Sequence, residues 1–490
     1  MSRDGRVSLT LLALALTLGV LADLLFHGRP LGIGVFVWAA ALVAALALLL
    51  RLVRAPLHQG RRMMAAPLLV FAAMFAWHDS RLLVAVNLIA LAGALSLGAL
   101  RRTEPDPTRA GLADYLAAGA AAGFASFAGA VHLLHKDVPW DEAAEALRGR
   151  RSVAIARGFA IGIPLLVLFG TLFAAADAVF RNLLADALPS FAAPWSHVLL
   201  AAAFAWGSAG LLRDLLAARE DARALSPESL ARTRGLSLGG TEIAVALAAV
   251  DALFLAFVLV QLRTFFGGRH FVESHAHVSY ASYARHGFFE LVAVAVLVLP
   301  TLLAGNTLVR DDETNRRRLV RMLSAALVAL VLVVIVSALQ RMRLYEHVYG
   351  LTQLRLYATG VMLWLAAVFA WLALTVLRGQ ARRFAVGTLV LGFAASLVTN
   401  VVNPDALIAR TNLSRPHIDV AYLARLGDDA VPVLVARLPT LKPEQRRELA
   451  TALLARHESN GGWTAWNLAR SRARHALATH RAQLVAAARE

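Results

Sequence analysis

Long apolar blocks separated by short polar stretches dominate this chain. The blocks run for about 18–24 residues, the length that an α-helix needs to cross a hydrocarbon core of roughly 30 Å. They lack the narrow apolar stripe of a soluble surface helix. The pattern predicts an all-α, polytopic transmembrane bundle of about eleven spans, within a range of 10–12. The predicted spans are Ser8–Phe26, Leu31–Val53, Met63–Trp77, Leu82–Leu100, Val153–Val179, Ala193–Leu215, Glu242–Leu262, Gly287–Ala304, Leu319–Leu339, Leu356–Leu377 and Phe384–Val402.

One further block, Gly111–Leu134, is apolar but rich in Ala and Gly. If it does not span, most Arg-rich loops fall on one side, as the positive-inside rule requires. We therefore predict that this block lies at the interface or re-enters the membrane. The N-terminus is then cytoplasmic, and the odd number of spans places the C-terminus outside. The 13 Lys and Arg after residue 402 argue against that side, but a tail of this length translocates largely regardless of charge.

The last part of the chain has the pattern of a small soluble helical region. Apolar residues at helical spacing predict helices over Asp419–Leu438, Pro443–His457 and Trp466–Glu490, similar to one or two helix-repeat units. Trp463 and Trp466 fit either interfacial anchors or helix packing. The predicted segments are a four-helix membrane segment (1–100), a basic linker with the interfacial or re-entrant helix (101–152), the main bundle (153–402) and the helical tail (403–490).

Composition supports a membrane protein and narrows its chemistry. Hydrophobic residues make up 59% of the chain, and the net charge of +17 comes from arginines clustered between apolar blocks. That placement reports topology, so we expect the lipid bilayer as the partner and no nucleic acid. Cysteine is absent, which excludes disulfides, thiol catalysis and cysteine-ligated metals. The first apolar block is followed at once by a second, so we expect a retained first helix. The frequent use of Ala, Arg and Leu is typical of a GC-rich bacterial genome, so we expect a bacterial inner membrane.

Ionisable residues inside apolar blocks are the sharpest sign of function, because they are costly in hydrocarbon. The candidates are Asp177 with Arg181 four residues on, Glu242 at a helix start, Asp251 near mid-span, and Glu290. We weigh three interpretations of these residues: ion pairs at helix ends or between helices, a proton or ion path, and catalysis.

The loop between residues 263 and 286 is the second sign. It carries four residues of a type that binds zinc, namely His270, Glu273, His275 and His277. Their spacing matches no HExxH-type motif, so a solvated, pH-responsive loop is the alternative. Tyr283 and Arg285 next to them fit interfacial anchors or a site for a lipid-linked substrate.

A third region, Tyr345–Tyr357, is dense in aromatic residues and suits a helix that enters the membrane from the headgroup layer. Within it, Arg355 and Tyr357 are candidates for contact with a lipid phosphate or a polar substrate, and Tyr349 is a further loop candidate. The chain has no GxSxG, P-loop or GxGxxG signature. We therefore expect no ATP-driven transport by this chain alone, and we favour a protein without a cofactor that is not an enzyme over an enzyme.

Several stretches resemble a known family. ASYARHGFFELVAVAVL, YGLTQLRLYATGVMLWLA, NPDALIARTN and DVAYLARLGDDAVPVL occur in order, and LFGTLFAAADAVFRNLL resembles the family's middle helix. The chain resembles an uncharacterised bacterial multi-pass membrane family, a domain of unknown function numbered forty-one seventy-three, with a close neighbour numbered forty-one fifty-three. The resemblance covers roughly residues 150–440 and implies no activity. The matched positions are Asp177, Phe180, Tyr283, Arg285, Gly287, Glu290, Tyr349, Gly350, Leu351, Thr352, Arg355, Asn403, Pro404 and Asp405.

Three functions remain open at this point. The first is a non-enzymatic envelope protein for sensing, assembly or scaffolding, with an envelope protein or lipid as partner. The second is a secondary transporter or channel that uses the intramembrane carboxylates. The third is an intramembrane enzyme acting on a lipid-linked substrate.

Overall fold

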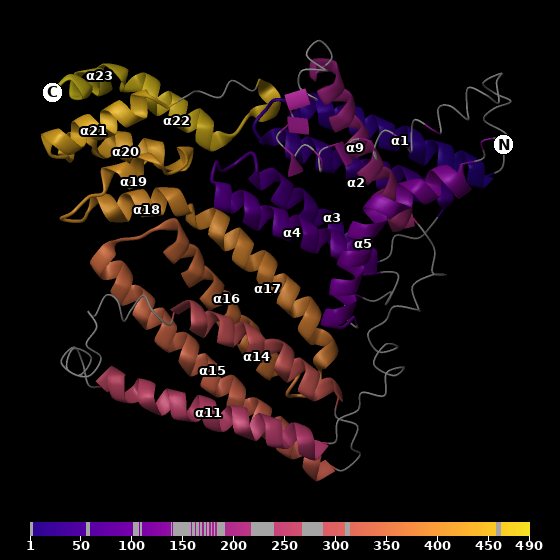
Figure 1. Cartoon of the computed structure of the whole chain (residues 1–490), viewed down its shortest axis with the longest axis vertical. Helices are drawn as coiled ribbons and strands as arrows, with labels where there is room; N and C mark the ends of the chain where they lie inside the picture. The colour runs from indigo at the N-terminus through magenta and orange to yellow at the C-terminus, as the bar shows by residue number, and fades with distance from the viewer. Residues whose placement is uncertain are drawn as a thin grey trace. The chain divides into compact units, whose positions relative to one another are not determined.

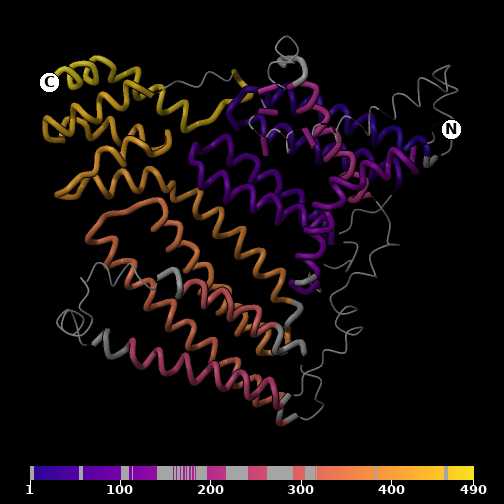
Figure 2. Tube along the Cα trace, in the orientation of Figure 1, coloured from indigo at the N-terminus to yellow at the C-terminus, as the bar shows by residue number. Residues whose placement is uncertain are grey.

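The computed structural model describes residues 3–54, 59–100, 107, 110–138, 140, single positions between 158 and 183, 192–216, 240–266, 288–308, 314–456 and 462–490 (Figure 2). Within these ranges the secondary structure is entirely helical, with no strand. The predicted all-α fold is therefore confirmed.

Nine helices in the described ranges are long and apolar enough to cross a membrane. Eight coincide with predicted spans, and the ninth, Asp114–Asp137, covers the block that we predicted to lie at the interface or re-enter. The predicted span Met63–Trp77 is a helix of only 16 residues. The predicted span Gly287–Ala304 falls on a helix from Phe288 to Leu308, whose described apolar stretch runs from Leu291 to Leu303. Most of Val153–Val179 lies outside the described residues.

Large apolar side chains are exposed along these helices. Ile89, Leu253 and Leu297, for example, are 73%, 69% and 66% exposed. A soluble protein rarely shows so much apolar surface, whereas lipid-facing positions require it. The chain is thus a multi-pass membrane protein.

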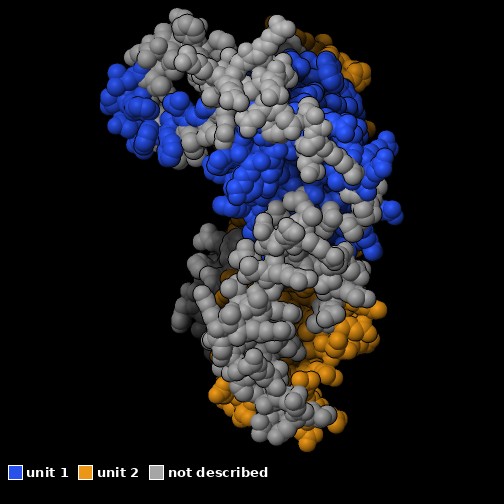
Figure 3. Space-filling view, turned by 90° about the vertical axis from the view of Figure 1, so that its right-hand side faces the viewer, with its two compact units in different colours: residues 1–107, 114–223, 457–471 blue, residues 108–113, 224–456, 472–490 orange. Residues whose placement is uncertain are grey.

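The contacts divide the chain into two compact units (Figure 3). Unit 1 contains Met1–Pro107, Asp114–Arg223 and His457–Ser471, and unit 2 contains Thr108–Ala113, Ala224–Arg456 and Arg472–Glu490. This division follows tertiary contacts, whereas the segments that we predicted, with limits at 100, 152 and 402, followed the order of apolar blocks.

Unit 1 is built on antiparallel helices: α1 (Arg3–Phe26), α2 (Ile33–Val53), α3 (Gln59–Met74), α4 (Arg81–Ala99) and α9 (Ala192–Leu216). The most extensive pairings are α1 with α9 and α3 with α4. At one end, which we name the Arg61 end, the buried Arg61 donates to the carbonyl of Leu215 in the last turn of α9, and Gly98 of α4 packs against Leu215. The opposite end holds the α1–α2 and α3–α4 turns, and we name it the His27 end.

Helix α5 (Leu112–His132), continued by a short π-helix to Asp137, crosses the other helices of unit 1 instead of running beside them (Figure 1). Gly119 packs on Ser96 near the end of α4, and Gly129 packs on Gly210 of α9. Asp137 pairs with Arg213 at 2.5 Å. All of these contacts lie in the halves of α4 and α9 nearer the Arg61 end. The helix is continuous from Leu112 to His132, and the stretch Asp114–Asp137 is long and apolar enough to cross a membrane.

Residues 463–470, which we name the return segment, close the His27 end of unit 1. Trp466 O accepts a hydrogen bond from Ile33 N at 2.9 Å, and Leu468 N donates to Ala76 O at 2.8 Å. Asn467 Nδ2 donates to the carbonyls of Phe75 and His78 at 2.8 and 2.7 Å. The return segment therefore supplies partners for the backbone of both turns, which would otherwise need water.

Both tryptophans of the return segment have exposed side chains. Trp463 and Trp466 are 67% and 42% exposed, beside the turn that begins α2. Of the two alternatives left by the sequence, this favours interfacial anchors.

In unit 2, five long helices share one apolar core: α11 (Gly240–Phe266), α14 (Phe288–Leu308), α15 (Thr314–Tyr349), α16 (Gln353–Thr375) and α17 (Ala381–Val402). Gln261 of α11 accepts hydrogen bonds from Ser337 Oγ at 2.9 Å and from Arg341 at 2.6 Å on α15. At 36 residues, α15 is about 54 Å long, against a hydrocarbon core of roughly 30 Å. Its last three turns continue beyond the predicted span Leu319–Leu339 and carry polar residues.

The C-terminal region is helical, as predicted, but its helices are shorter. They are α18 (Pro404–Leu413), α19 (Val420–Ala424), α20 (Val431–Arg437), α21 (Pro443–Leu454), α22 (Leu468–Thr479) and α23 (Arg481–Arg489). The predicted helix Asp419–Leu438 is interrupted at Gly427, and Trp466–Glu490 is interrupted at His480. Asp419 caps α19 by accepting from Tyr422 N at 2.9 Å. A second apolar core joins α18–α23 with Leu351 and Leu356.

Candidate functional site

The turn between α15 and α16 is held by the C-terminal helices of the same unit, and we name this contact the hub. Gly350 adopts φ +82°, a conformation that side chains with a Cβ rarely adopt. A Cβ there would also lie 2.9 Å from Asn412 Oδ1. Thr352 then caps α16 by accepting from Arg355 N at 3.4 Å. Glycine at 350 thus permits both the reversal of the chain and the close approach of α18.

Asn412 on α18 binds the backbone of this turn with both ends of its amide. Its Oδ1 accepts from Leu351 N at 2.9 Å, and its Nδ2 donates to Leu351 O at 2.8 Å. Through these two hydrogen bonds, the single side chain of Asn412 satisfies both main-chain polar groups of Leu351.

Asp405 and Tyr422 bind Gln353, the first residue of α16. Asp405 is fully buried; one of its oxygens accepts from Gln353 Nε2 at 2.7 Å and the other from Gly427 N at 3.0 Å. The Tyr422 hydroxyl accepts from Gln353 N at 2.8 Å. The start of α16 is therefore fixed to α18 and α19 by neutral and charged hydrogen bonds at once.

Burial is the main cause that raises the pKa of Tyr422 above its usual value of about 10. The carboxylates of Asp405 and Asp419 raise this pKa further, whereas Arg355 and the hydrogen bond from Gln353 lower it. The hub thus favours the neutral phenol.

Two arginines of the hub satisfy the carbonyls at the end of α15. Arg355 donates to Gly350 O at 2.5 Å, and its guanidinium lies 4.1 Å from the centre of the Tyr345 ring. Arg415 donates to Glu346 O at 2.8 Å and also to His347 O. Cations at a helix C-terminus are favoured by the helix dipole. The ring of Tyr349, the last residue of α15, is tilted against that of Tyr345, with the ring centres 5.0 Å apart.

An open groove of about 770 Å³ lies beside the hub. It is lined by residues from the end of α15, the end of α18 and the loop that follows: His347, Val348, Tyr349, Thr411, Ser414, Arg415, Pro416, His417, Ile418 and Asp419. The imidazoles of His347 and His417 and the Tyr349 ring are exposed in it. The groove has the mixed aromatic and polar lining of a binding surface.

The predicted intramembrane residues occupy separate places. Glu242 is exposed in the first turn of α11, as expected for a carboxylate at a helix start. Asp177 is exposed and accepts from Val179 N and Phe180 N at 2.7 and 3.3 Å, so it caps a local turn. Arg181 lies outside the described residues. Glu290 lies in the first turn of α14, where only the backbone is described.

Asp251 sits near the middle of α11. Both of its carboxylate oxygens are shielded from solvent and have no hydrogen-bonding partner among the described residues. In a membrane helix, a carboxylate in such a place is a candidate for an ion path.

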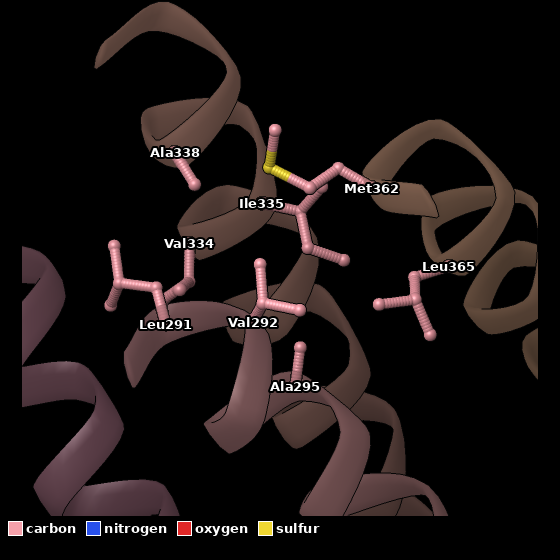
Figure 4. Close-up of a pocket in the computed structure, with 8 residues that line it drawn as sticks. All are labelled: Leu291, Val292, Ala295, Val334, Ile335, Ala338, Met362 and Leu365. Atoms are coloured by element: carbon pink, nitrogen blue, oxygen red, sulfur yellow. The ribbon is translucent and has the colours of Figure 1, made fainter. Parts of the chain in front are cut away.

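A small cavity in the core of unit 2 is entirely apolar (Figure 4). Its volume is about 10 Å³, and it is lined by Leu291, Val292, Ala295, Val334, Ile335, Ala338, Met362 and Leu365. A site of this kind offers no partner to an ion or a water molecule. Neither this cavity nor the groove is lined by Asp251 or Glu242.

A model of the family described as a domain of unknown function, DUF4153, matches residues 65–436. The chain belongs to this family. It is the neighbour, forty-one fifty-three, of the two families that the sequence resembles. Searches of the curated proteins and of the solved structures gave no match.

The DUF4153 match contains every residue of the hub from Gly350 to Tyr422. Of the residues that carried the resemblance, Gly350, Leu351, Thr352, Arg355 and Asp405 meet in the hub. Their partners Asn412 and Tyr422 lie in stretches that carried the resemblance, but neither they nor Arg415 were predicted as site residues, because their roles depend on a turn 61 to 69 positions away.

The predicted metal residues His270, Glu273, His275 and His277, and the loop candidates Tyr283 and Arg285, lie outside the described residues. Side chains of types that ligate metals converge elsewhere in the described part, at Asp23, His27 and His197. This group lies before residue 65 on α1 and within the DUF4153 match on α9. Since Asp23 and His197 are 174 positions apart, no local motif could reveal it.

Proposed function

We propose that this DUF4153 protein is a non-enzymatic scaffold of the bacterial envelope that offers its C-terminal helices as a rigid docking surface. The main support for this proposal is the hub. It ties the end of a long membrane helix to α18 and α19 through side chains that bind main-chain groups rather than pointing into a reaction site. The groove beside it is exposed and open, which suits a partner's polypeptide segment better than a small substrate.

A photo-reactive amino acid at His417, in the groove, tests this proposal in intact cells. The matched control position is Glu444, which is exposed on α21 outside the groove. We expect one discrete protein adduct from His417 that Asn412→Ala weakens, and no such adduct from Glu444. Equal adducts at both positions, or none at His417, would refute docking at the groove.

Transport is the second candidate, because Asp251 is shielded and has no partner among the described residues. Reconstituted protein would then move protons or a solute across vesicles. Asp251→Asn should abolish that flux, whereas Glu242→Gln, at the exposed helix start, should retain it. Full flux with Asp251→Asn would remove Asp251 from any path.

We further propose a topology of eleven spans in the bacterial inner membrane, with the N-terminus cytoplasmic and the C-terminus outside. The Arg61 end carries the Arg-rich α2–α3 connection, which favours the cytoplasm. The contacts of α5 gather near this same end, which supports a helix that lies along the interface. The return segment belongs to the opposite end, and no helix after Val402 in the described residues is long and apolar enough to cross.

The position of the start of α9 gives an independent count of the membrane spans that precede it. Ser196 meets His27 at the His27 end, so α9 starts outside if α1 starts inside. With α5 at the cytoplasmic interface, one span between residues 138 and 191 is required, as predicted for Val153–Val179. If α5 also crossed, two crossings would bring α9 to start on the wrong side.

A further inference from the structure

We propose that Asp23, His27 and His197 form a binding site for one divalent transition-metal ion, with Zn²⁺ as the first candidate. The inference is independent of the docking function. Two imidazoles and one carboxylate are the ligand set of many zinc sites with an open coordination position.

The helical spacing of α1 places two of the ligands on one face. Asp23 and His27 are four residues apart, and His27 N still donates to Asp23 O at 3.0 Å. Residues at this spacing lie one above the other on a helix, as the two histidines of an HExxH motif do. Both side chains face the first turns of α9, where His197 lies.

The three side chains already contact one another. His197 Nδ1 lies 3.0 and 2.8 Å from the two Asp23 oxygens. The rings of His27 and His197 are stacked with their centres 3.6 Å apart. One ligand atom from each residue lies within 4.8 Å of the others. Tetrahedral bonds of about 2.1 Å place donors about 3.4 Å apart, so side-chain rotation suffices to bring them together.

The close packing of α1 on α9 fixes this geometry from the bilayer side. Gly19, one turn before Asp23, approaches Ala201 and Ala205 so closely that a Cβ would overlap Ala201 O. Phe204 packs on Phe26 and Trp38 at 5.5 and 5.4 Å. The ligands therefore sit on a rigid helix pair, which is what a pre-formed site needs.

Solvent reaches the site from its other side. The side chain of His197 is 51% exposed, whereas that of Asp23 is 14% exposed. The nearby Arg29 donates to Leu24 O and Thr464 Oγ1 at 3.0 and 2.8 Å, which directs its charge away from the ligands. Ser196 Oγ lies 2.7 Å from His27 Nε2 and can orient that ring or offer a fourth oxygen.

Calorimetric titration of the chelator-treated, full-length protein with Zn²⁺ tests the proposal. We expect about one equivalent to bind, and at least tenfold weaker binding for His197→Ala and for Asp23→Asn. The matched control is His275→Ala/His277→Ala, in the loop that the sequence proposed as a metal site, and it should keep wild-type affinity.

Co²⁺ supplies a readout that does not depend on the variants folding. Bound Co²⁺ should give the intense visible bands of a tetrahedral nitrogen and oxygen site, and Zn²⁺ should displace them. No stoichiometric binding, equal affinity in the Asp23 and His197 variants, or loss only in the His275/His277 variant would each overturn the proposal. A Co²⁺ spectrum like that of the hydrated ion would do so as well.

Discussion

At the hub, side chains form the hydrogen bonds to main-chain groups that regular secondary structure provides elsewhere. Asn412 satisfies the backbone of Leu351, and Arg415 satisfies the last carbonyls of α15. Buried main-chain groups without partners are costly. The polar residues of this region therefore determine whether the C-terminal helices stay fixed to the end of α15.

We predict that Asn412→Ala lowers the stability of the hub by about 2 kcal/mol, because it leaves the N–H and C=O of Leu351 without their partners. Hydrogen exchange of a peptide covering residues 345–357 should become faster. Thr451→Ala is the control, since the Thr451 hydroxyl bonds only to Arg447 O within its own helix. Unchanged exchange in Asn412→Ala would show that this side chain does not hold the turn.

The ionisation of Tyr422 should determine how the stability of the hub changes at alkaline pH. The pKa of Tyr422 is raised in the folded state, so below about pH 10 the phenol is neutral in both states and its contribution is complete. Above that pH the unfolded state ionises first, and the stability falls as pH rises through the folded pKa.

Thermal unfolding of wild type and Tyr422→Phe between pH 8 and pH 11 measures this effect. At the lower pH the variant should be about 1 kcal/mol less stable, because Gln353 N loses its acceptor. The difference should shrink above about pH 10. A constant difference would contradict the raised pKa.

Among the helices, α5 is the one whose position depends on how closely it packs where it crosses α9. It meets α9 where two glycines face each other, and a Cβ at Gly210 would overlap the carbonyls of Ala125 and Ser126. Gly207, on the same helix, has open space around its Cβ position. The two glycines therefore form a matched pair of test positions.

Gly210→Ala should destabilise the protein in detergent by about 1–3 kcal/mol through overpacking. Gly207→Ala should be neutral or stabilising by up to about 1 kcal/mol, because alanine favours helix. Thermal unfolding compares the two variants. Similar effects from both would mean that the crossing of α5 and α9 is not tightly packed.

The orientation of α5 gives a second prediction for this element. The chain has no cysteine, so Asp114→Cys and Lys136→Cys each introduce a single thiol at one end of the helix. An interfacial α5 exposes both thiols to a membrane-impermeant maleimide from the cytoplasmic side. Labelling of the two ends from opposite sides would show that α5 spans.

For the whole molecule, the proposed topology predicts the side of the C-terminal helices. In spheroplasts, the impermeant maleimide should label His417→Cys at once, and Arg54→Cys only after permeabilisation. Both positions are exposed. The reverse pattern would place the C-terminus in the cytoplasm and require an even number of spans.

The sequence by itself determined the membrane environment, the helical class and the position of most spans. These follow from apolar length alone, because a backbone in hydrocarbon must satisfy its own hydrogen bonds. The metal residues and loop anchors between residues 263 and 286 stay predictions.

Only the tertiary structure decided which polar residues meet. Asn412 reaches Leu351 and His197 reaches Asp23 across 61 and 174 positions, and no pattern of apolar residues encodes such pairs. The buried Arg61 shows the same limit, because its sequence context indicates a loop charge whereas its side chain caps α9. The length of each apolar segment determines a single helix, whereas the packing of the helices against one another determines which polar side chains meet.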